Sequence, residues 1–497
     1  MPSVSKRTRS FWWIGALIML AGLALRLWQL GRASLWYDEV ITELYAQASW
    51  DRFFTQVLEI GNHTPLYFIL MRFFPTDNEF WLRLPSVMLG VIGVALLIYC
   101  SVRLYADERL ALLAGGLLAF NPYHIWLSRT ARPYPLLFVF SLLASYYFLL
   151  LLRGERTRKN WIAFTLCSMI AYVTHYFAVG LPLAQYVLFA FILRGNRGFF
   201  RRWLWAQVIA GIPLLIWIIA LLQQDQVAFG IGWIPRPRVT AIPVTLWNML
   251  LGYDGSFPWY LPVGLAAAAV GLGYGIMLAV RERKKDRQNF YWFWLLVAPL
   301  SLGFVVSIIR PLYVDRYFTV FLPSVILLAA HGWNHLPLRL YWRIGLAVVV
   351  MVVGSVSVVT TLEREDDEKE DWRSAAAFIE SEQQPEDALL LEEPIVILLV
   401  RRYWDTGDMP YTWLEGGSLV VEQFKTPVSR VWALYRNPNE DGHQQGVLPD
   451  FDPFEPSNSP LSDWLIARRD QVIMQKELNG ITLLLVDMSG ELAGAAN

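Results

Sequence analysis

Residues 11–39, FWWIGALIMLAGLALRLWQLGRASLWYDE, contain an apolar run followed directly by an acidic pair. The apolar part, Phe11–Leu30, is about 20 residues long, the length that an α-helix needs to cross a bilayer. No small-residue cleavage site follows it, so we expect a retained first helix rather than a cleaved signal peptide. Asp38 and Glu39 then stand at a membrane boundary, where ionisable side chains are costly and usually functional.

The composition predicts that most of the chain lies in a membrane. Of the 497 residues, 55% are hydrophobic, only 17% are charged, and 23 are tryptophans. Apolar runs of spanning length predict a polytopic α-helical membrane protein with about 11 transmembrane helices. The expected spans are 11–30, 81–102, 110–126, 135–152, 161–176, 178–193, 204–222, 260–280, 291–309, 318–331 and 344–362.

The distribution of Lys and Arg predicts the orientation. Lys6, Arg7 and Arg9 precede the first span, and the segments 153–159, 194–202 and 281–287 are rich in cations. These loops alternate with loops that carry fewer cations, so the positive-inside rule places the N-terminus in the cytoplasm. An odd number of spans then puts the acidic C-terminal part outside the cytoplasm.

The same distribution argues against a nucleic-acid partner, because the basic residues sit in short loops between spans. Cys100 and Cys167 both lie in apolar segments. They are expected to be small core residues, with no disulfide framework.

Two connections on the predicted outer side are long. Gly31–Phe80 contains the acidic pair and a stretch, Asp51–Glu59, that could form an amphipathic helix on the membrane surface. Gln223–Pro258 is rich in Gly and Pro and is predicted to hold a short helix near Val244–Leu251. Loops of this length usually carry function.

The pattern changes after residue 362, which we expect to separate a membrane module (1–362) from a small outer domain (363–497). The charged run Glu363–Asp371 is typical of a solvated linker. Beyond it, helical and strand patterns alternate, which predicts a small α/β domain. The expected helices are Trp372–Glu380 and Trp464–Glu477, and the expected strands are Ala388–Glu392, Arg430–Leu434 and Ile481–Val486.

Asp38 and Glu39 are the candidate catalytic residues. Neighbours on a helix point about 100° apart, so one would face a substrate and the other a partner group. A carboxylate can act as the general base for a hydroxyl or amine nucleophile. Alternatively, the pair only marks the end of a helix at the water boundary.

His63 lies in the same outer loop and could bind a phosphate, a sugar hydroxyl or a metal, or be an ordinary loop histidine. If the site holds a divalent cation such as Mg or Mn, its ligands would come from Asp38, Glu39 and His63. Asn62-His63-Thr64 also matches a glycosylation sequon, which the following Pro65 weakens.

Arginines at outer boundaries run against the positive-inside trend. Arg129 and Arg132 precede Tyr134, and Arg310 and Arg316 precede Tyr317. A guanidinium group binds phosphate through two parallel hydrogen bonds, so these arginines suit an anionic headgroup. Each could instead extend its charge to lipid headgroups without further function. Arg236 and Arg238 in the second long loop are weaker candidates.

Five short motifs in this order resemble the GT-C superfamily of membrane glycosyltransferases, and most closely its protein O-mannosyltransferase and aminoarabinose transferase branch. The resemblance covers about Leu35 to Ala330, with His63-Thr64-Pro65 where the family commonly has His-Pro-Pro. The motifs are Leu35-Trp36-Tyr37-Asp38-Glu39, His63-Thr64-Pro65-Leu66-Tyr67, Arg83-Leu84-Pro85-Ser86, Ala131-Arg132-Pro133-Tyr134, and Arg316-Tyr317 with Pro323.

The resemblance implies an inverting transfer of a hexosyl or pentosyl sugar from a polyprenyl-phosphate donor to a lipid, glycan or protein acceptor. It implies that Asp38 is the catalytic carboxylate and that Arg132 and Arg316 hold the departing phosphate. His63, Tyr67, Arg83, Arg129, Tyr134, Arg310 and Tyr317 complete the expected substrate-binding set.

The sequence leaves two other classes of protein open. A lipid or glycan transporter would carry polar residues deep in mid-span, and few are present. A non-catalytic envelope-assembly protein would use its C-terminal domain as the binding module. The chain carries no P-loop, GxGxxG, HExxH or paired CxxC motif, so soluble nucleotide chemistry is not supported.

Overall fold

The computed structural model describes residues 9–61, 63–191, 196–224, 234, 236–252, 258–363, 370–392, 396–413, 428–436, 460–478 and 480–489. Lys6, Arg7, Asn62 of the sequon, most of the linker after Glu363 and much of the second long loop lie outside these ranges. The chain divides into two compact units. One comprises Met1–Leu30 and Thr42–Thr360, and the other comprises Gly31–Ile41 and Thr361–Asn497.

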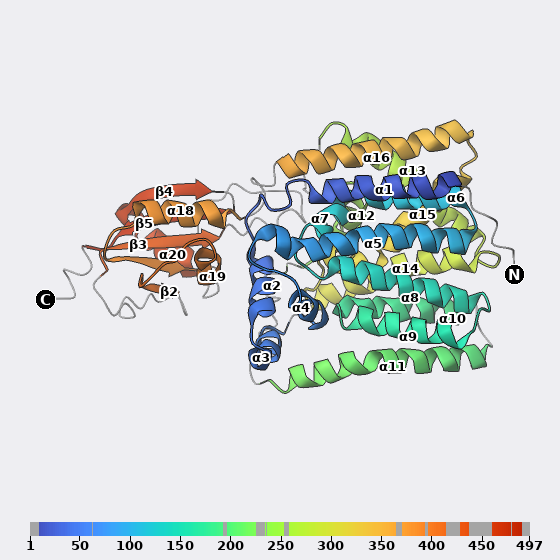
Figure 1. Cartoon of the computed structure of the whole chain (residues 1–497), viewed down its shortest axis with the longest axis horizontal. Coiled ribbons are helices and arrows are strands. Elements are labelled where there is room, and N and C mark those ends of the chain that lie inside the picture. Colours follow the sequence, from blue (N-terminus) through green and yellow to red (C-terminus); the bar gives the residue numbers. More distant parts are fainter. Residues whose placement is uncertain are drawn as a thin grey trace. The chain divides into compact units, whose positions relative to one another are not determined.

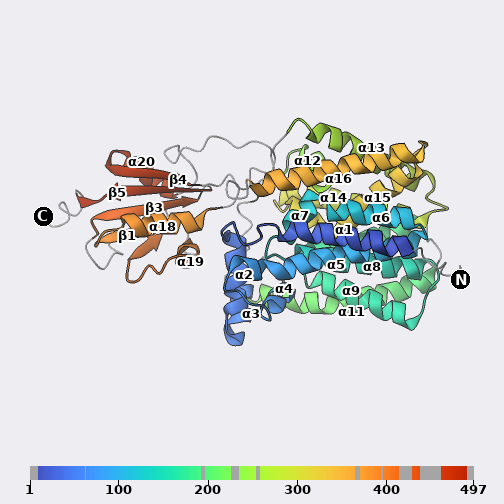
Figure 2. The same cartoon turned by 45° about the horizontal axis from the view of Figure 1, so that its top comes forward.

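The larger unit is a bundle of helices that run nearly parallel to one another (Figures 1 and 2). The short helices α3 and α4 lie across one end of this bundle. The helices are α1 (Arg9–Leu27), α2 (Tyr37–Gln47, shared with the second unit), α3 (Trp50–Ile60), α4 (Leu66–Met71), α5 (Glu79–Tyr105), α6 (Glu108–Ala119), α7 (Pro122–Ser128), α8 (Tyr134–Leu152), α9 (Arg158–Tyr172), η1 (Tyr176–Val179), α10 (Gly180–Phe191), α11 (Arg197–Leu222), α12 (Ala241–Leu250), α13 (Leu261–Arg281), α14 (Arg287–Ile309), η2 (Asp315–Phe321), α15 (Leu322–His335) and α16 (Leu340–Glu363).

The predicted multi-pass architecture is confirmed, with fewer full-length spans than the expected 11. Among the described residues, seven helices are long and apolar enough to cross a membrane: α1, α5, α8, α11, α13, α14 and α16. An eighth span is possible if α6 and α7, which bend by 60° at their junction, count as one. Other predicted spans, such as 161–176 and 318–331, correspond to shorter helices. Hydropathy marks apolar stretches but not where a helix ends, and these stretches contain helix breaks.

The break between α6 and α7 has a local cause. The Asn121 side chain accepts a hydrogen bond from the backbone N–H of His124 (2.8 Å), which caps α7, and Pro122 occupies the first turn. Proline has no N–H to donate and is favoured at this position. The predicted span 110–126 is therefore bent rather than continuous.

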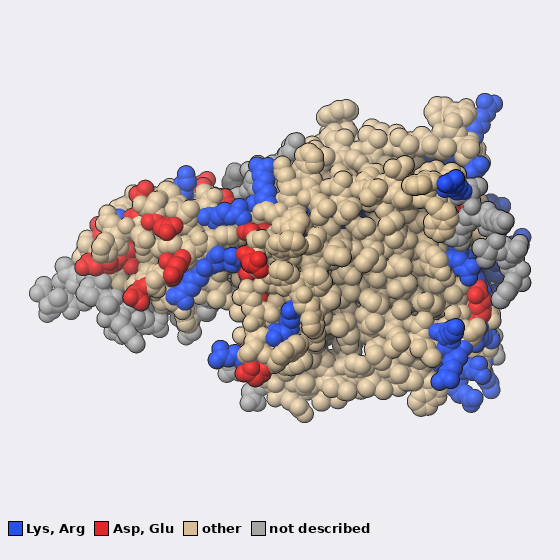
Figure 3. Space-filling model, viewed as in Figure 1, with Lys and Arg blue, Asp and Glu red and all other residues tan. Residues whose placement is uncertain are grey.

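The surface of the bundle agrees with a membrane environment. Large apolar side chains face outward, among them Leu17, Trp205 and Ile216, each exposed by more than 60%. Figure 3 shows that Lys and Arg gather at the end of the bundle that holds the N-terminus, while its middle is almost free of charge. Charged ends and an apolar waist suit a bilayer.

Two short helices and the cysteines agree with the sequence predictions. The amphipathic stretch forms α3, and the short helix of the second long loop is α12. Cys100 and Cys167 are both free and buried.

The second unit contains a five-stranded sheet in the order β2-β1-β3-β5-β4. Strand β1 pairs in parallel with β2 and β3, and β5 pairs antiparallel with β3 and β4. Its elements are α18 (Trp372–Glu382), β1 (Asp387–Leu391), α19 (Val396–Arg401), β2 (Tyr411–Trp413), β3 (Arg430–Arg436), α20 (Pro460–Ala467), η5 (Arg469–Gln471), β4 (Val472–Leu478) and β5 (Ile481–Asp487).

The three predicted strands and the helix at 372–380 are confirmed, but the helix predicted at Trp464–Glu477 is wrong in its second half. Helix α20 ends at Ala467, and Val472–Leu478 is the edge strand β4. This strand forms because β5 offers it an antiparallel partner, and that pairing cannot be read from the helical spacing of the segment.

Candidate functional site

The acidic pair lies in the first turn of α2. Glu39 is fully buried and Asp38 is half-buried, so the two carboxylates face different surroundings, as expected for neighbours on a helix. The chain before the helix is anchored within the second unit, because Ser34 Oγ donates to the Glu370 carbonyl and the Tyr403 hydroxyl accepts from the Leu35 N–H, both at 2.7 Å.

Arg132 lies in the turn between α7 and α8, and hydrogen bonds from two other elements, one of them braced by a third, hold this turn. The Ser86 hydroxyl of α5 donates to the Arg132 carbonyl (3.3 Å), and the Tyr67 hydroxyl of α4 is 2.8 Å from Ser86 Oγ. Thr42 of α2 donates to the neighbouring Ala131 carbonyl (2.9 Å). Three of the motifs found in the sequence therefore meet at one turn, and Arg132 itself is almost fully buried.

His63 contacts the Arg132 side chain, with His63 Nε2 at 3.4 Å from Arg132 Nη2. An arginine can only donate, so the histidine nitrogen is the acceptor in this contact. The main chain of His63 is fixed separately. Its carbonyl accepts from the Tyr176 hydroxyl (3.1 Å) and from Trp217 Nε1 (3.2 Å).

His175, between α9 and η1, joins two parts of the site that are far apart in the sequence. Its ring centroid lies 6.0 Å from that of Tyr134 and 5.1 Å from that of Tyr317. Burial lowers the pKa of His175 to about 3, and the positive charges of Arg132 and Arg316 lower it further in the same sense. The imidazole is therefore neutral and lies within electrostatic reach of both arginines.

Arg316 lies in η2 and is 9% exposed. The neighbouring Asp315 is also buried. Its Oδ1 accepts from the Arg316 backbone N–H (2.6 Å), and its Oδ2 accepts from Asn248 Nδ2 (2.8 Å). The Tyr123 hydroxyl donates to the Asp315 carbonyl (2.9 Å), so α7 and α12 together fix the start of η2.

The other predicted arginines occupy different surroundings. Arg83 donates to the Leu30 carbonyl (2.9 Å), and Arg129 donates to the carbonyls of Arg26 and Trp28 (3.0 and 2.5 Å). Both satisfy main-chain groups around the end of α1. Arg310 is exposed after the last residue of α14, and Arg236 and Arg238 are exposed as well.

Sequence reasoning missed His175 and Asp315. His175 was placed inside a predicted span, and a single histidine in such an apolar stretch was a usable signal, because ionisable residues in membrane segments are rarely passive. Asp315 stands next to Arg316 in a motif that the sequence singled out. Its burial could not be predicted without the contact to Asn248.

The predicted metal ligands do not form a recognisable site. Among the described residues, no three side chains of His, Cys, Asp or Glu gather closely enough to hold a metal ion.

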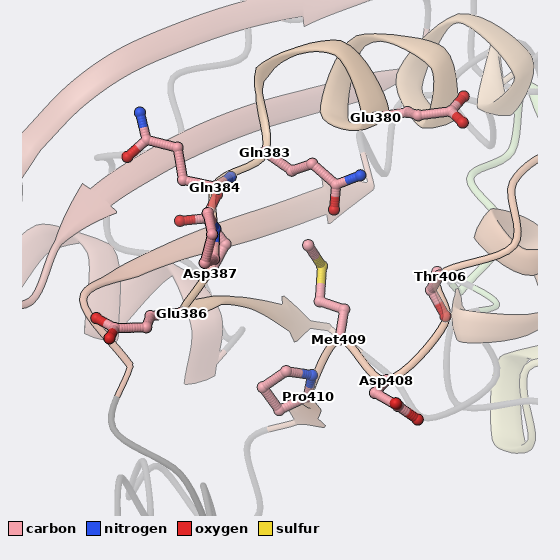
Figure 4. Close-up of a pocket in the computed structure, with 10 residues that line it drawn as sticks. Glu380, Gln383, Gln384, Glu386, Asp387, Thr406, Asp408, Met409 and Pro410 are labelled. Carbon is pink, nitrogen blue, oxygen red and sulfur yellow. Dashed lines mark hydrogen bonds between the residues drawn. The ribbon is translucent and has the colours of Figure 1, made fainter.

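The second unit has an open groove of about 760 Å³ beside α18 and the start of β1. Its carboxylates do not converge, because Glu380, Glu386 and Asp408 point away from one another while Met409 fills the middle (Figure 4). The fourth, Asp387, is bound to Arg430 Nε and Nη2 at 2.8 and 2.7 Å. This groove is therefore not arranged to chelate a cation.

Comparison with known proteins finds one family model that matches part of the chain. The model of the dolichyl-phosphate-mannose-protein mannosyltransferase family matches residues 62–220. That range contains His63, Tyr67, Arg83, Arg132 and His175. No curated protein matched the sequence.

Solved structures share the fold over almost the whole chain. ArnT from Cupriavidus metallidurans in the apo state is 13% identical, with a TM-score of 0.62, over 96% of this chain and 98% of that one. The same protein bound to undecaprenyl phosphate is 12% identical, with a TM-score of 0.59 and the same coverage. The archaeal oligosaccharyltransferase AglB from Archaeoglobus fulgidus, in complex with an inhibitory peptide and a dolichol-phosphate, is 10% identical, with a TM-score of 0.51, over 89% of this chain and 72% of that one. The GT-C fold predicted from the five motifs is confirmed.

Proposed function

We propose that this chain, which has the fold of the GT-C membrane glycosyltransferases, transfers a sugar from a polyprenyl-phosphate donor to an acceptor. The observation that carries the proposal is that the rings of Tyr134 and Tyr317 lie 6.0 and 5.1 Å from that of His175, so the motifs of the buried Arg132 and Arg316, 184 positions apart (316 − 132), meet at this histidine. A guanidinium group binds a phosphate through two parallel hydrogen bonds, so this pair of arginines suits a phosphate headgroup. The undecaprenyl phosphate in the similar ArnT structure is an anion of this class.

Arg132 and Arg316 would bind the phosphate of the donor and stabilise the charge that grows on it as the glycosidic bond breaks. His63 would orient the Arg132 guanidinium through their contact. Tyr134 and Tyr317, whose rings flank His175, would border the same headgroup site. For Arg83 and Arg129, the hydrogen bonds to main-chain carbonyls support a role in shaping the site rather than in touching the ligand.

Asp38 would be the general base. In the proposed step, an acceptor hydroxyl oxygen attacks the anomeric carbon, and the bond from that carbon to the phosphate oxygen breaks. The hydroxyl proton passes to the Asp38 carboxylate, and the polyprenyl phosphate leaves with the bonding electron pair. Attack opposite the leaving group inverts the anomeric carbon. The buried Glu39 would act as a neighbouring partner group.

The proposal assigns no step to a metal ion. A hexosyl or a pentosyl group could be transferred, and the acceptor could be a lipid, a glycan or a protein. The N-terminus would lie in the cytoplasm and the C-terminal unit outside it, which the gathering of cations at the N-terminal end of the bundle supports.

The test is a donor screen with the purified full-length chain in detergent. Polyprenyl-phosphate sugars are added with pooled lipid, glycan and peptide acceptors, and released polyprenyl phosphate is measured. We expect release by the wild type and by Asp51→Asn, a matched control with an exposed carboxylate on α3, but not by Asp38→Asn.

Equal release by Asp38→Asn would overturn the assignment of the base. A wild-type chain that neither binds nor turns over any donor would overturn the transferase itself.

A further inference from the structure

The hydrogen bonds around His175 fix its tautomer. The backbone N–H of Phe177 donates to His175 Nδ1 (3.2 Å), so Nδ1 carries the lone pair. In a neutral imidazole one nitrogen accepts and the other carries the proton. The proton of His175 is therefore on Nε2, on the ring edge away from the cap, and this nitrogen can only donate.

Aromatic neighbours hold the ring in one orientation. Tyr317, Phe177 and Tyr134 have ring centroids 5.1, 5.7 and 6.0 Å from that of His175. They come from η2, η1 and the start of α8. A donor that is fixed by packing loses little entropy when a ligand binds, which is how binding sites gain affinity.

The electrostatic surroundings explain why a neutral donor suits this position. The positive charges of Arg132 and Arg316 both lower the pKa of His175. A protonated His175 would add a third positive charge to theirs, which is strongly disfavoured in a buried site. An uncharged N–H adds a hydrogen bond for an anion without adding to the repulsion among the cations.

We infer that His175 is a phosphate-binding residue that donates its Nε2 proton to the polyprenyl phosphate headgroup held by Arg132 and Arg316. The inference rests on the proposed function and deepens it, because it adds a residue to that headgroup site. The alternative is that His175 only caps η1 through Nδ1.

Two substitutions separate these roles. In His175→Asn, the side-chain oxygen can take the place of Nδ1 as the cap, since Asn is a favoured N-cap residue, but the Nε2 donor is lost. In His175→Gln, the longer amide can place an N–H near Nε2, but the cap is lost. Arg132→Gln serves as the reference for the headgroup site itself.

The experiment measures binding of undecaprenyl phosphate and of the uncharged alcohol undecaprenol to each full-length variant by native mass spectrometry. Removing one donor to a charged group is expected to weaken undecaprenyl phosphate binding by His175→Asn about tenfold. His175→Gln should stay within about threefold of the wild type. Binding of undecaprenol should be the same in the wild type and in all three variants.

Three outcomes would overturn the inference. The first is that His175→Asn binds undecaprenyl phosphate with full affinity while His175→Gln binds it more weakly, which would mean that His175 only caps η1. The second is a His175→Gln variant that binds undecaprenyl phosphate no better than His175→Asn. The third is an equal loss for undecaprenol, which would mean a general disturbance. In any of these cases, the result for Arg132→Gln shows how far the failure extends. If Arg132→Gln also leaves the affinity for undecaprenyl phosphate unchanged, the headgroup site of the proposed function fails as well. If Arg132→Gln weakens that binding, only the role of His175 fails.

Discussion

Nε2 of His63 lies 3.4 Å from Nη2 of Arg132, although 69 positions separate the two residues. The contact links the first long loop to the turn before α8. Because Tyr176 and Trp217 hold the His63 carbonyl, the loop keeps its place when the side chain is changed. His63→Ala therefore removes the side-chain contact with Arg132 together with a ring contact to Phe68, whose centroid lies 5.4 Å away.

We expect His63→Ala to weaken undecaprenyl phosphate binding about three- to tenfold, as for a lost hydrogen bond to a charged group. The double variant His63→Ala/Arg132→Gln should bind no more weakly than Arg132→Gln alone, since contacting residues are not additive. Additive losses in this cycle would contradict the coupling.

The stability of the chain should depend on pH through His175. Its pKa is lowered to about 3 in the folded chain, first by burial and then by Arg132 and Arg316, from an ordinary value of 6.5. Between these values the unfolded chain binds a proton that the folded chain does not, so stability falls as the pH drops below about 6.5.

At pH 5 this group should cost at most about 2 kcal/mol. Thermal unfolding in detergent should show a larger loss of Tm between pH 7.5 and pH 5 for the wild type than for His175→Gln. Parallel losses in the two proteins would show that His175 titrates normally.

Arg26 should be essential for the bend between α6 and α7. It is fully buried and donates to the carbonyls of Ala119 (3.0 Å) and Leu118 (3.3 Å), which end α6, and to His124 Nδ1 (2.8 Å). The Leu118 carbonyl also accepts from the backbone N–H of Asn121 (3.4 Å), so it is the Ala119 carbonyl that depends most on Arg26.

Arg26→Met should leave the Ala119 carbonyl and His124 Nδ1 without this buried donor and destabilise the chain by about 3 kcal/mol or more. The readout is Tm and the monodisperse yield in detergent. Arg109→Met removes an exposed arginine from α6 and is expected to change neither. A normal Tm for Arg26→Met would mean that other groups satisfy the bend.

Gly275 allows α13 and α15 to pack in direct backbone contact. A Cβ atom at this position would lie 1.9 Å from the Leu328 carbonyl oxygen, a backbone atom that cannot turn aside. Small residues at helix interfaces permit this close approach in membranes. Gly275→Ala should therefore force the helices apart and lower Tm by several degrees.

Gly273 on the same helix is the matched control. Nothing lies within 4 Å of a Cβ atom there, so Gly273→Ala should be neutral or stabilise the helix by about 0.5–1 kcal/mol. The same response from both variants would argue against the close contact.

Asp387 should anchor the sheet of the second unit. Its carboxylate is buried and accepts from Arg430 Nε and Nη2, and also from Trp432 Nε1 (2.9 Å). The hydrogen bonds to Asp387 raise the pKa of Arg430. Asp387→Ala leaves the tryptophan donor unsatisfied and should cost about 2–4 kcal/mol.

Limited proteolysis of the full-length chain should reveal the loss as faster cleavage between Thr361 and Asn497. Asp408→Ala, at an exposed position on the groove, is expected to be cleaved at the wild-type rate. If Asp387→Ala is cleaved no faster than the wild type, the ion pair between Asp387 and Arg430 is dispensable.

The sequence by itself determined the properties that depend on local patterns. Hydropathy identified the membrane helices, five short motifs identified the fold, and short apolar runs identified β1, β3 and β5. Each of these signals lies within a few consecutive residues, because helix and strand periods and partition into lipid are set locally.

Only the tertiary structure decided which groups meet. It bent the span at Asn121, turned residues 472–478 into β4, and grouped residues 31–41 with the C-terminal unit. It also brought His175 between the motifs of Arg132 and Arg316. These results depend on partners supplied by distant segments. No local pattern encodes such partners, because a hydrogen bond or a buried charge gains its energy from whatever the fold places beside it.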